Sequence, residues 1–339
     1  MKKMKAAVLY EQNKPLVIEE LAIPELQTGQ VLVKIVASGI CKSQLNEIRG
    51  RKGPDKYLPH TLGHEGAGVV ESVGSGVEKV IKGDHVVLSW IKGKGINAGP
   101  PVYFSGRQKI NSGQLSTFNE YTVTAENRVT PIDKRMPFAE AALLGCAAST
   151  GIGSVMNIAK LKKGESIAVF GCGGIGLSAI MAASVLAAGR IIAVDIDDHK
   201  LELAKALGAS EIINARKDGL NKIEADYAIE SAGRAESMQQ AFCSVKRGGG
   251  KAIIVGNLPA GSKIEIDPFE LICGREIVGS WGGSTNPDQD IPKYVDLFLS
   301  GKLEMKKMLG GSYRLDQINQ AVESLEQGSY GRTTIKFAA

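Results

Sequence analysis

The sequence predicts an α/β protein of two domains, in which a doubly wound parallel sheet in the middle of the chain is flanked by segments of a β-rich domain. Three observations predict this fold. The chain has 339 residues, more than the ~100–200 residues of one ordinary hydrophobic core. Short apolar runs alternate with amphipathic stretches between about 148 and 285. Residues 1–147 instead contain strand-like runs separated by Gly and Pro.

The composition excludes several classes of protein. Hydrophobic residues make up 43% and charged residues 23%, as in ordinary globular chains, and no apolar run approaches the ~18–20 residues that cross a bilayer. We therefore expect no membrane association. The 41 basic and 36 acidic residues are interspersed, so the net charge of +5 does not predict nucleic-acid binding. Five cysteines without a pairing pattern favour the reducing cytoplasm over a secreted disulfide framework.

The first β-α-β unit of the parallel sheet is visible at 166–195. The apolar run 166–170 predicts a strand, and the stretch 175–188, rich in Ala, Leu, Ile and Met, predicts a helix that Gly189 ends. The next strand, 191–194, leads into Asp195. This order is typical of parallel strands joined by a crossover helix.

Later elements extend the same pattern. Asp197 and Asp198 are candidate N-caps for a helix over 200–207, and Gly208 is its stop signal. Apolar runs at 226–231, 251–256 and 275–281 then predict further buried strands. A parallel, doubly wound sheet is the natural packing for these elements.

The turn between the first strand and helix reads Gly-Cys-Gly-Gly-Ile-Gly at 171–176. In this context the pattern predicts a dinucleotide site, because an acid, Asp195, ends the next strand about 20 residues on. Gly171 permits the tight turn, Gly173 lets the backbone approach the pyrophosphate, and Gly176 allows close helix packing.

Gly174 and Ile175 complete this cofactor-binding turn, and residues 148–285 form the predicted dinucleotide-binding domain. Asp195 would bind the adenosine ribose hydroxyls. A carboxylate there repels a 2′-phosphate and no Arg follows at 196–200, so we expect NAD rather than NADP. The alternative is a glycine turn that only tightens a strand-helix junction.

The flanking segments, 1–147 and 286–339, predict a second domain. Runs at 31–36, 68–73 and 85–88 are strand-like and indicate a small barrel or sandwich.

Three residues of this region, Cys41, His64 and Cys146, have side chains that can bind a metal. Their spacing is too wide for a zinc finger, but two thiolates and one imidazole satisfy a catalytic zinc and leave a fourth position open. Alternatively, the cysteines are small buried hydrophobes and the histidine is a satisfied core residue.

Several motifs occur in the order found in one enzyme family, and together they span essentially the whole chain. By these motifs the sequence resembles the medium-chain, zinc-dependent alcohol dehydrogenases, for which a Cys₂His zinc site is characteristic. The resemblance implies a Rossmann-type domain and a GroES-like catalytic domain. The segments that carry it are 39–43 (Gly-Ile-Cys-Lys-Ser), 63–68 (Gly-His-Glu-Gly-Ala-Gly), 82–86 (Lys-Gly-Asp-His-Val), 145–151 (Gly-Cys-Ala-Ala-Ser-Thr-Gly), the turn 171–176 and the last strand within 330–337.

The resemblance implies roles for the residues of the catalytic site. Cys41, His64 and Cys146 would be the zinc ligands, with Glu65 as an occasional ligand or a partner of the site. Ser43 would accept the proton of the alcohol and pass it toward the nicotinamide ribose, although a serine here could simply bond its own backbone. The implied activity is zinc-dependent hydride transfer between an alcohol and NAD.

Other basic residues match cofactor-binding positions of the family. Lys42 and Arg332 match positions that contact the pyrophosphate, and Arg234 matches one near the adenosine. Lys200 is assigned to the same cofactor. Each of these side chains could equally be a solvated surface charge.

Trp90, Phe118 and Asn119 fall where the family lines its substrate pocket, although core packing is the ordinary fate of an aromatic residue. The amide of Asn119 suggests a polar substrate, so we rank a polar secondary alcohol first. A simple primary alcohol and the glutathione adduct of formaldehyde are the alternatives, and the C-terminal half resembles the glutathione-dependent branch. A non-enzymatic alternative is a metal-free dinucleotide-binding sensor.

The departures from the family are informative. Many relatives carry four cysteines for a structural zinc where residues 91–117 contain none, so we expect a single zinc. This segment is rich in Gly, Pro and basic residues and is interpreted as a solvated loop rather than a lid.

Gln44 replaces a common Asp that orients the zinc-binding imidazole, and Asn46 replaces a titrating His of the proton relay. The pH profile of turnover should therefore lack an ionisation from position 46. Relatives pair through an edge strand, here 275–281, so a homodimer or homotetramer is expected.

Overall fold

The computed structural model describes residues 2–219, 223–328 and 330–338. The chain forms two compact units. The β-rich unit comprises Met1–Cys146, Asn286–Leu299 and Leu309–Ala339, and the parallel-sheet unit comprises Ala147–Thr285 and Ser300–Met308. Residues 300–308, which the sequence-based division assigns to the flanking domain, group with the parallel-sheet unit.

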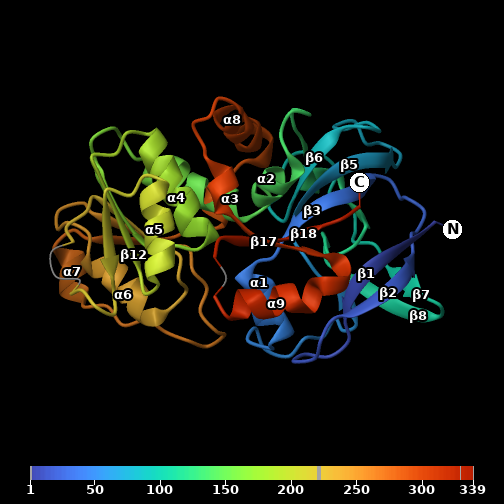
Figure 1. Cartoon of the computed structure of the whole chain (residues 1–339), viewed down its shortest axis with the longest axis horizontal. Helices are drawn as coiled ribbons and strands as arrows, with labels where there is room; N and C mark the ends of the chain where they lie inside the picture. The colour runs from blue at the N-terminus through green and yellow to red at the C-terminus, as the bar shows by residue number, and fades with distance from the viewer. Residues whose placement is uncertain (1, 220–222, 329, 339) are drawn as a thin grey trace. The chain divides into compact units, whose positions relative to one another are not determined.

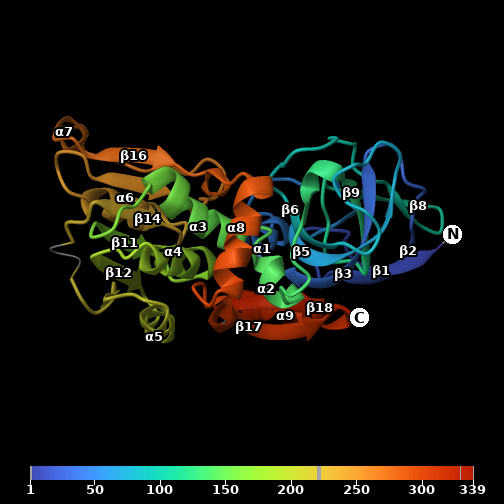
Figure 2. The same cartoon turned by 90° about the horizontal axis from the view of Figure 1, so that it is seen from above.

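The parallel-sheet unit contains a six-stranded sheet in the order β13-β12-β11-β14-β15-β16, with every neighbouring pair parallel. This is the 3-2-1-4-5-6 order of doubly wound dinucleotide-binding sheets, so the predicted fold class is confirmed. Figure 2 shows β16, β14, β11 and β12 in that order across the sheet. The strands are β11 (Ser166–Phe170), β12 (Arg190–Asp195), β13 (Glu211–Asn214), β14 (Tyr227–Glu230), β15 (Lys251–Ile254) and β16 (Glu276–Gly279).

Helices cover this sheet, and α4 and α5 are seen beside its strands in Figure 1. Alternate residues of β11, including Ala168 and Phe170, form a core cluster with Phe242 of α6, which therefore packs on one face of the sheet. The predicted N-cap of α5 is present, because Asp197 accepts a hydrogen bond of 3.0 Å from the backbone N–H of His199. The helices are α3 (Ala147–Gly153), a π-helix (Ser154–Ala159), α4 (Gly174–Val185), α5 (Asp198–Ala206), α6 (Ala235–Cys243) and α7 (Pro268–Ile272), with 3₁₀ turns at Gly282–Ser284 and Met305–Met308.

The β-rich unit contains a closed barrel and a seven-stranded sheet. The barrel order is β1-β2-β7-β8-β4, and the sheet order is β10-β6-β5-β3-β18-β17 with β9 paired to β3. The barrel strands are β1 (Lys3–Leu9), β2 (Val17–Ala22), β4 (His60–Thr61), β7 (Tyr103–Ser105) and β8 (Gln108–Ser112). The sheet strands are β3 (Gln30–Gly39), β5 (Glu65–Val73), β6 (His85–Ser89), β9 (Tyr121–Ala125), β10 (Val129–Pro131), β17 (Leu309–Arg314) and β18 (Arg332–Lys336).

Helices complete the described part of the β-rich unit. Helix α9 packs its apolar face, with Ile318 and Val322, into the core cluster that also contains Leu45 and Ile48 of α1. The helices are α1 (Lys42–Ile48), α2 (Phe138–Leu143), α8 (Pro287–Leu299) and α9 (Ile318–Glu326), with 3₁₀ turns at Glu126–Arg128 and Leu315–Gln317.

The segment 91–117 differs from the solvated loop that we expect from its composition, because it contains β7 and β8. Tyr103 and Ile110 are fully buried. The hydroxyl oxygen of Tyr103 accepts the backbone N–H of Val123 at 3.1 Å, and burial raises the pKa of Tyr103 to about 12. Strands of three and five residues are too short to stand out among Gly, Pro and basic neighbours.

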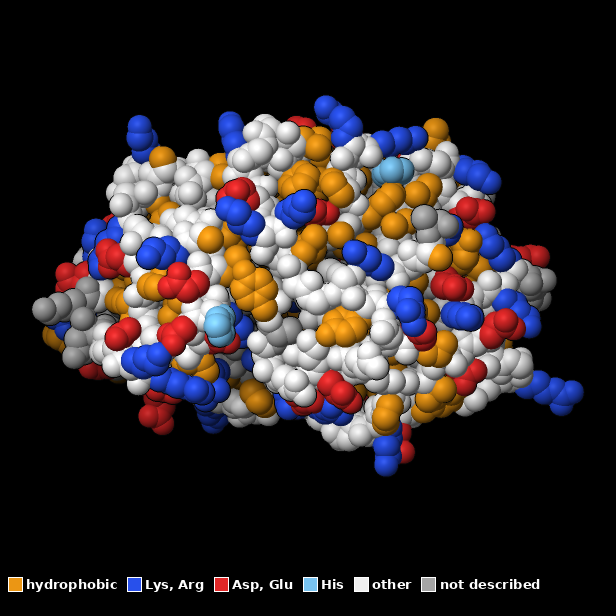
Figure 3. Space-filling view, in the orientation of Figure 1, with side chains coloured by type: hydrophobic (Ala, Val, Ile, Leu, Met, Phe, Trp, Pro, Cys, Tyr) orange, Lys and Arg blue, Asp and Glu red, His pale blue; other side chains and the backbone are white. Residues whose placement is uncertain are grey.

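Among the residues described, no helix is long and apolar enough to cross a membrane. Lys and Arg side chains alternate with Asp and Glu over the face of the molecule seen in Figure 3. This pattern agrees with the interspersed charges of the sequence.

Candidate metal centre and cofactor site

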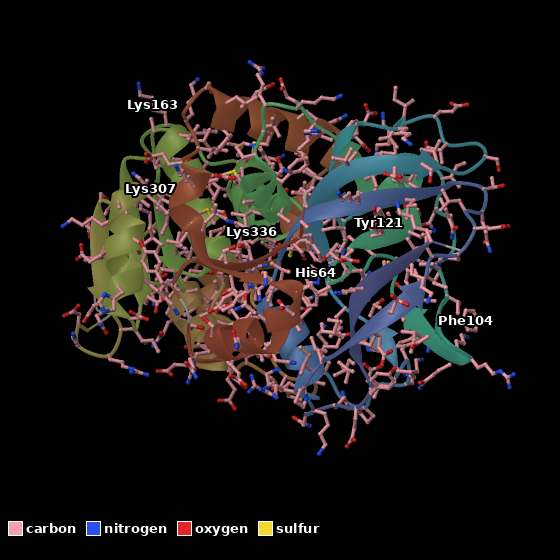
Figure 4. The ribbon with its side chains drawn as sticks, turned by 45° about the vertical axis from the view of Figure 1, so that its right-hand side comes forward. His64, Phe104, Tyr121, Lys163, Lys307 and Lys336 are labelled. Atoms are coloured by element: carbon pink, nitrogen blue, oxygen red, sulfur yellow. The ribbon has the colours of Figure 1, made fainter. Side chains whose placement is uncertain are left out.

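Three side chains that can bind a metal meet in the β-rich unit. One ligand atom each from Cys41, His64 and Cys146 lies within 4.8 Å of the other two. Cys41 immediately precedes α1, His64 immediately precedes β5, and Cys146 follows α2. Figure 4 marks the position of His64.

Strand pairing explains how residues so far apart in the chain meet. Ser38 of β3 pairs with Gly66 of β5, so Cys41 and His64 lie at adjoining ends of two neighbouring strands. Ser89, at the end of β6, pairs with Glu65, and its hydroxyl donates to the carbonyl of Gly145 at 2.8 Å. The residue after Gly145 is Cys146.

Gly145 is required for this approach. A Cβ on Gly145 would overlap the carbonyl oxygen of Leu88 and lie 2.9 Å from Cα of Glu65. Only glycine lets the chain that carries Cys146 come this close to the ends of β5 and β6.

The imidazole of His64 has one nitrogen engaged and one without a partner. Its Nδ1 contacts Nε2 of Gln44, while Oε1 of Gln44 accepts the backbone N–H of Cys41 at 3.2 Å. Nε2 of His64 is buried and has no hydrogen-bond partner within the described part of the chain. An unpartnered imidazole nitrogen next to two thiols is the donor set that zinc prefers, so the residues fit a zinc ion.

The two thiols lie close together and differ in acidity. The neighbouring Cys146 holds the pKa of Cys41 well below its ordinary value, with Arg332 adding to the effect. The neighbouring Cys41 and burial raise the pKa of Cys146. A thiolate is the form in which a cysteine binds a metal.

Glu65 and Arg332 form a buried ion pair beside the thiols. Glu65 has no exposed surface, and Nε of Arg332 donates to its Oε1 at 2.8 Å. Burial raises the pKa of Glu65, although the guanidinium charge opposes this shift. Glu65 is not part of the three-residue cluster, and the expected contact of Arg332 with a pyrophosphate stays a prediction.

The first turn of α1 carries Lys42 and Ser43. Lys42 is exposed and Ser43 is half-buried. Over the residues that the structure describes, the hydroxyl of Ser43 makes no hydrogen bond, so it is available to a bound molecule. Their assigned roles in cofactor binding and proton transfer stay predictions.

The structure brings Trp90 to the metal centre, and Phe118 and Asn119 are buried in the same unit. The Trp90 ring meets the His64 ring edge-on, with centroids 6.4 Å apart. Phe118 belongs to a core cluster, and Asn119 is fully buried with Nδ2 donating to Oγ of Ser116 at 2.8 Å. The pocket role of all three side chains stays a prediction.

The glycine turn of the parallel-sheet unit has the geometry of a phosphate-binding turn. Gly171 has a φ of 90°, which permits the tight turn after β11, and Gly174 and Ile175 form the first turn of α4. A Cβ on Gly176 would overlap the carbonyl oxygen of Gly171, whereas one on Gly173 would meet nothing within 4 Å. The open space at Gly173 leaves room for a ligand to approach the backbone.

Asp195 ends β12 beside this turn. Its Oδ2 accepts the backbone N–H of Cys172 at 2.6 Å, and its Oδ1 accepts that of Ile196 at 2.7 Å. The carboxylate is therefore fixed in place by the turn. Lys200 is half-buried on α5, and Arg234 is exposed at the start of α6.

Two features of the site escape the sequence analysis. Arg128 is 7% exposed, and its Nη1 donates to the carbonyl of Trp90. The pairing of Glu65 with Arg332 joins residues 267 positions apart. Arg128 lies among polar residues, in Glu-Asn-Arg-Val-Thr at 126–130, so its sequence neighbours do not mark it as buried.

Comparison with known proteins decides the family. Residues 27–134 match the family model of the alcohol dehydrogenase GroES-like domain, and residues 174–300 match that of the zinc-binding dehydrogenases. The chain belongs to the medium-chain, zinc-dependent alcohol dehydrogenases. This zinc alcohol dehydrogenase is an oxidoreductase. Membership of the family supports the use of zinc and a nicotinamide cofactor, and a small molecule as the substrate.

Its relatives match over the whole chain. S-(hydroxymethyl)glutathione dehydrogenases of Synechocystis sp. and Haemophilus influenzae are each 35% identical over 99% of this alcohol dehydrogenase, and over 100% and 97% of their own length. Benzyl alcohol dehydrogenase from Acinetobacter calcoaceticus has a TM-score of 0.91 and 31% identity, with both chains covered completely. An alcohol dehydrogenase zinc-binding domain protein from Burkholderia ambifaria has a TM-score of 0.93 and 31% identity over the full length of both chains.

Proposed function

We propose that this enzyme oxidises an alcohol, or reduces the matching carbonyl, with NAD at a single catalytic zinc held by Cys41, His64 and Cys146. The observation that carries the proposal is the convergence of their ligand atoms within 4.8 Å, with Nε2 of His64 buried and unpartnered among the described residues. Two sulfurs and one nitrogen leave a coordination position for substrate, as catalytic zinc sites do.

The protein's own residues orient the site and move the proton. When bound, zinc polarises the oxygen of the substrate and NAD receives the hydride. Ser43, two residues after Cys41, would accept the hydroxyl proton of the substrate on its Oγ while it releases its own hydroxyl proton toward the nicotinamide ribose. Gln44 holds the ring of His64, and Glu65 balances the buried charge of Arg332. Asn46 does not titrate, so the proton passes beyond Ser43 without an ionising group at position 46.

NAD is favoured over NADP by Asp195. Its carboxylate is held at the end of β12 by the backbone of the turn and of the next residue. A fixed negative charge there attracts ribose hydroxyls and repels a 2′-phosphate. Lys200, Arg234, Lys42 and Arg332 are assigned to the same cofactor.

The segment 91–117 favours one catalytic zinc and no structural zinc of the four-cysteine kind. This segment contains no cysteine. Where many relatives have a zinc-binding lobe, it forms a loop followed by β7 and β8. The carboxylate of Glu126 accepts the backbone N–H of Ile96 in that loop at 2.7 Å. The segment is thus held by protein groups rather than by four thiolates.

Three candidate substrates can be tested directly. The names of the relatives at 35% identity favour the hydroxymethyl adduct of glutathione. Asn119, the basis for a polar secondary alcohol, is engaged with Ser116, which weakens that ground. We therefore place the glutathione adduct first, a polar secondary alcohol second and a simple primary alcohol third.

The experiment combines metal analysis with a substrate screen. Purified protein should contain zinc and reduce NAD faster than NADP with one of these alcohols, and formaldehyde should be oxidised only when glutathione is present. Turnover of polar secondary alcohols without glutathione would reverse the order of substrates. A protein that binds NAD but contains no zinc and oxidises none of the alcohols would instead be a dinucleotide sensor.

We also propose a homodimer or homotetramer in the cytoplasm. Strand β16 is an edge strand of the parallel sheet. Trp281, just beyond it, is 80% exposed, and Ile272 of α7 is 79% exposed. Exposed apolar side chains next to a free strand edge favour pairing with a second copy. All five cysteines are free thiols, as a reducing compartment requires.

A further inference from the structure

A second group of side chains that can bind a metal lies in the β-rich unit. It consists of Glu47 near the end of α1, Asp55 in the loop that follows, and His60 at the start of β4. One ligand atom from each lies within 4.8 Å of the other two. None of the three has a role in the proposed reaction. Helix α1, which carries Glu47, is marked in Figure 1.

The orientation of His60 determines what the group can hold. Its ring is almost completely buried, and Nδ1 lies 3.1 Å from the carbonyl oxygen of Thr61. Because a carbonyl can only accept, Nδ1 carries a hydrogen and the lone pair of a neutral ring lies on Nε2. Nε2 lies 2.7 Å from Oδ2 of Asp55 and 3.9 Å from Oε1 of Glu47. A lone pair facing two carboxylates is repulsive, so a positive charge, either a proton on Nε2 or a metal ion, has to lie among the three atoms.

In each of the three residues, the polar atom that faces away from the group makes a hydrogen bond to another part of the chain. Oδ1 of Asp55 accepts the backbone N–H of Tyr57 at 2.9 Å, and Oε2 of Glu47 accepts from Nζ of Lys52 at 3.0 Å. One oxygen of each carboxylate and one nitrogen of His60 are thus left facing a common point. An imidazole whose other N–H donates to a backbone carbonyl is the usual arrangement of metal-binding histidines.

A proton on Nε2 satisfies this group only in part. It would bond Asp55 at 2.7 Å, but 3.9 Å is too far for a hydrogen bond to Glu47. A divalent ion about 2.1 Å from each ligand atom would engage all three residues, after the Asp55 and His60 atoms separate to about 3 Å.

We propose that Glu47, Asp55 and His60 form a second metal site that binds a first-row divalent cation such as Zn²⁺ through two carboxylate oxygens and one imidazole nitrogen. Water fills the remaining positions. The ion would tie the loop after α1 to β4, and binding to the folded chain alone would stabilise that segment by mass action.

The test uses the full-length protein dialysed against buffered Zn²⁺, followed by metal analysis. Wild-type protein should hold two equivalents, and the His60→Gln and Glu47→Gln variants one each. A Cys41→Ser/Cys146→Ser variant should also hold one equivalent, which disappears when His60→Gln is added. His199→Gln, which alters an exposed histidine of the other unit, is the matched control and should hold two.

Co²⁺ separates the two sites spectroscopically. His60→Gln should keep the intense thiolate-to-cobalt absorption of the Cys41 site and lose only the weak absorption of an oxygen and nitrogen site. One equivalent in the wild type, unchanged by His60→Gln and Glu47→Gln, would overturn the proposal and leave only the contact of His60 with Asp55 in this group. Loss of zinc in the cysteine variant concerns the catalytic site alone, so failure of either proposal can be recognised separately.

Discussion

The two candidate sites of this enzyme are built in opposite ways. The dinucleotide turn is local, because Asp195 bonds the backbone of Cys172, 23 positions away, and the glycines lie in one stretch of six residues. The metal centre joins Cys41, His64 and Cys146 from three elements and depends on strand register to bring them together. The turn offers backbone groups, whereas the metal centre offers side chains. A substitution in the turn should therefore weaken cofactor binding only in part, whereas loss of one ligand of the metal centre should abolish zinc binding and turnover.

The largest effect is expected from removal of one metal ligand. Cys146→Ala leaves one sulfur and one imidazole, so turnover should fall far beyond the roughly 10–100-fold cost of losing a supporting contact. Zinc content should fall with it. The matched control is Cys243→Ala, which removes an exposed thiol and should leave both unchanged. Full turnover by a zinc-free Cys146→Ala protein would show that the side-chain cluster is not the reaction centre.

A pair of glycine variants separates cofactor binding from folding in the turn. An added methyl at Gly173 meets no protein atom within 4 Å, so Gly173→Ala should fold normally and weaken NAD binding roughly tenfold by blocking the pyrophosphate. At Gly176 the methyl overlaps the carbonyl oxygen of Gly171, and overpacking of this kind costs about 1–3 kcal/mol of stability. Titration with NAD and thermal unfolding measure the two effects. Equal loss of stability in both variants would contradict the distinction.

Gln44 should limit the zinc affinity of the metal centre, because its single amide oxygen is needed by two N–H donors, the backbone of Cys41 and the ring of a metal-bound His64. It accepts the N–H of Cys41, so the amide nitrogen is turned toward Nδ1 of His64. A metal on Nε2 requires a hydrogen on Nδ1, which an amide nitrogen cannot accept. To serve the imidazole, Gln44 has to reverse its amide and give up the N–H of Cys41.

A carboxylate at position 44 would accept both hydrogens at once. Gln44→Glu should therefore bind zinc about tenfold more tightly, while the metal-free protein loses stability through a buried charge. Gln44→Leu should weaken zinc binding by a similar factor. Competition with a chelator gives both affinities independently of activity, and equal affinities in the three proteins would exclude any influence of this contact on the metal.

The features that could be predicted from the sequence are those built from residues close in the chain, as in the dinucleotide turn, and the missed features depend on distant residues, as in the metal centre. The strand 166–170 and the cap at Asp197 are predicted because their signals, an apolar run and a side chain that bonds a backbone N–H two residues on, lie within a few neighbouring residues. The fold class follows from the order of such signals along the chain. Strands β7 and β8 are missed because their strength comes from barrel closure rather than from their own pattern. The Glu65 and Arg332 pair is missed because sequence spacing contains no sign of a contact across 267 positions.

The smallest effect concerns the segment that takes the place of a structural zinc. Oε1 of Glu126 accepts the backbone N–H groups of Glu78 and Lys79, each at 2.8 Å, and Oε2 accepts that of Ile96 at 2.7 Å. Although burial alone would raise its pKa, these N–H groups hold the pKa of Glu126 below its ordinary value. Glu126→Gln turns an NH₂ group toward one of these donors, and an unsatisfied buried donor costs about 1–3 kcal/mol.

The pH dependence of this cost tests its origin. A lowered folded pKa means that the carboxylate stabilises the protein fully above the ordinary value of about 4.3, and that this contribution is lost as the pH falls through the folded value. The gap in unfolding free energy between wild type and Glu126→Gln should therefore be constant near neutrality and shrink in acid. Urea unfolding at several pH values measures the gap. A gap that persists unchanged in strong acid would mean that the substitution acts through packing, and that charge does not hold this segment as thiolates and zinc would.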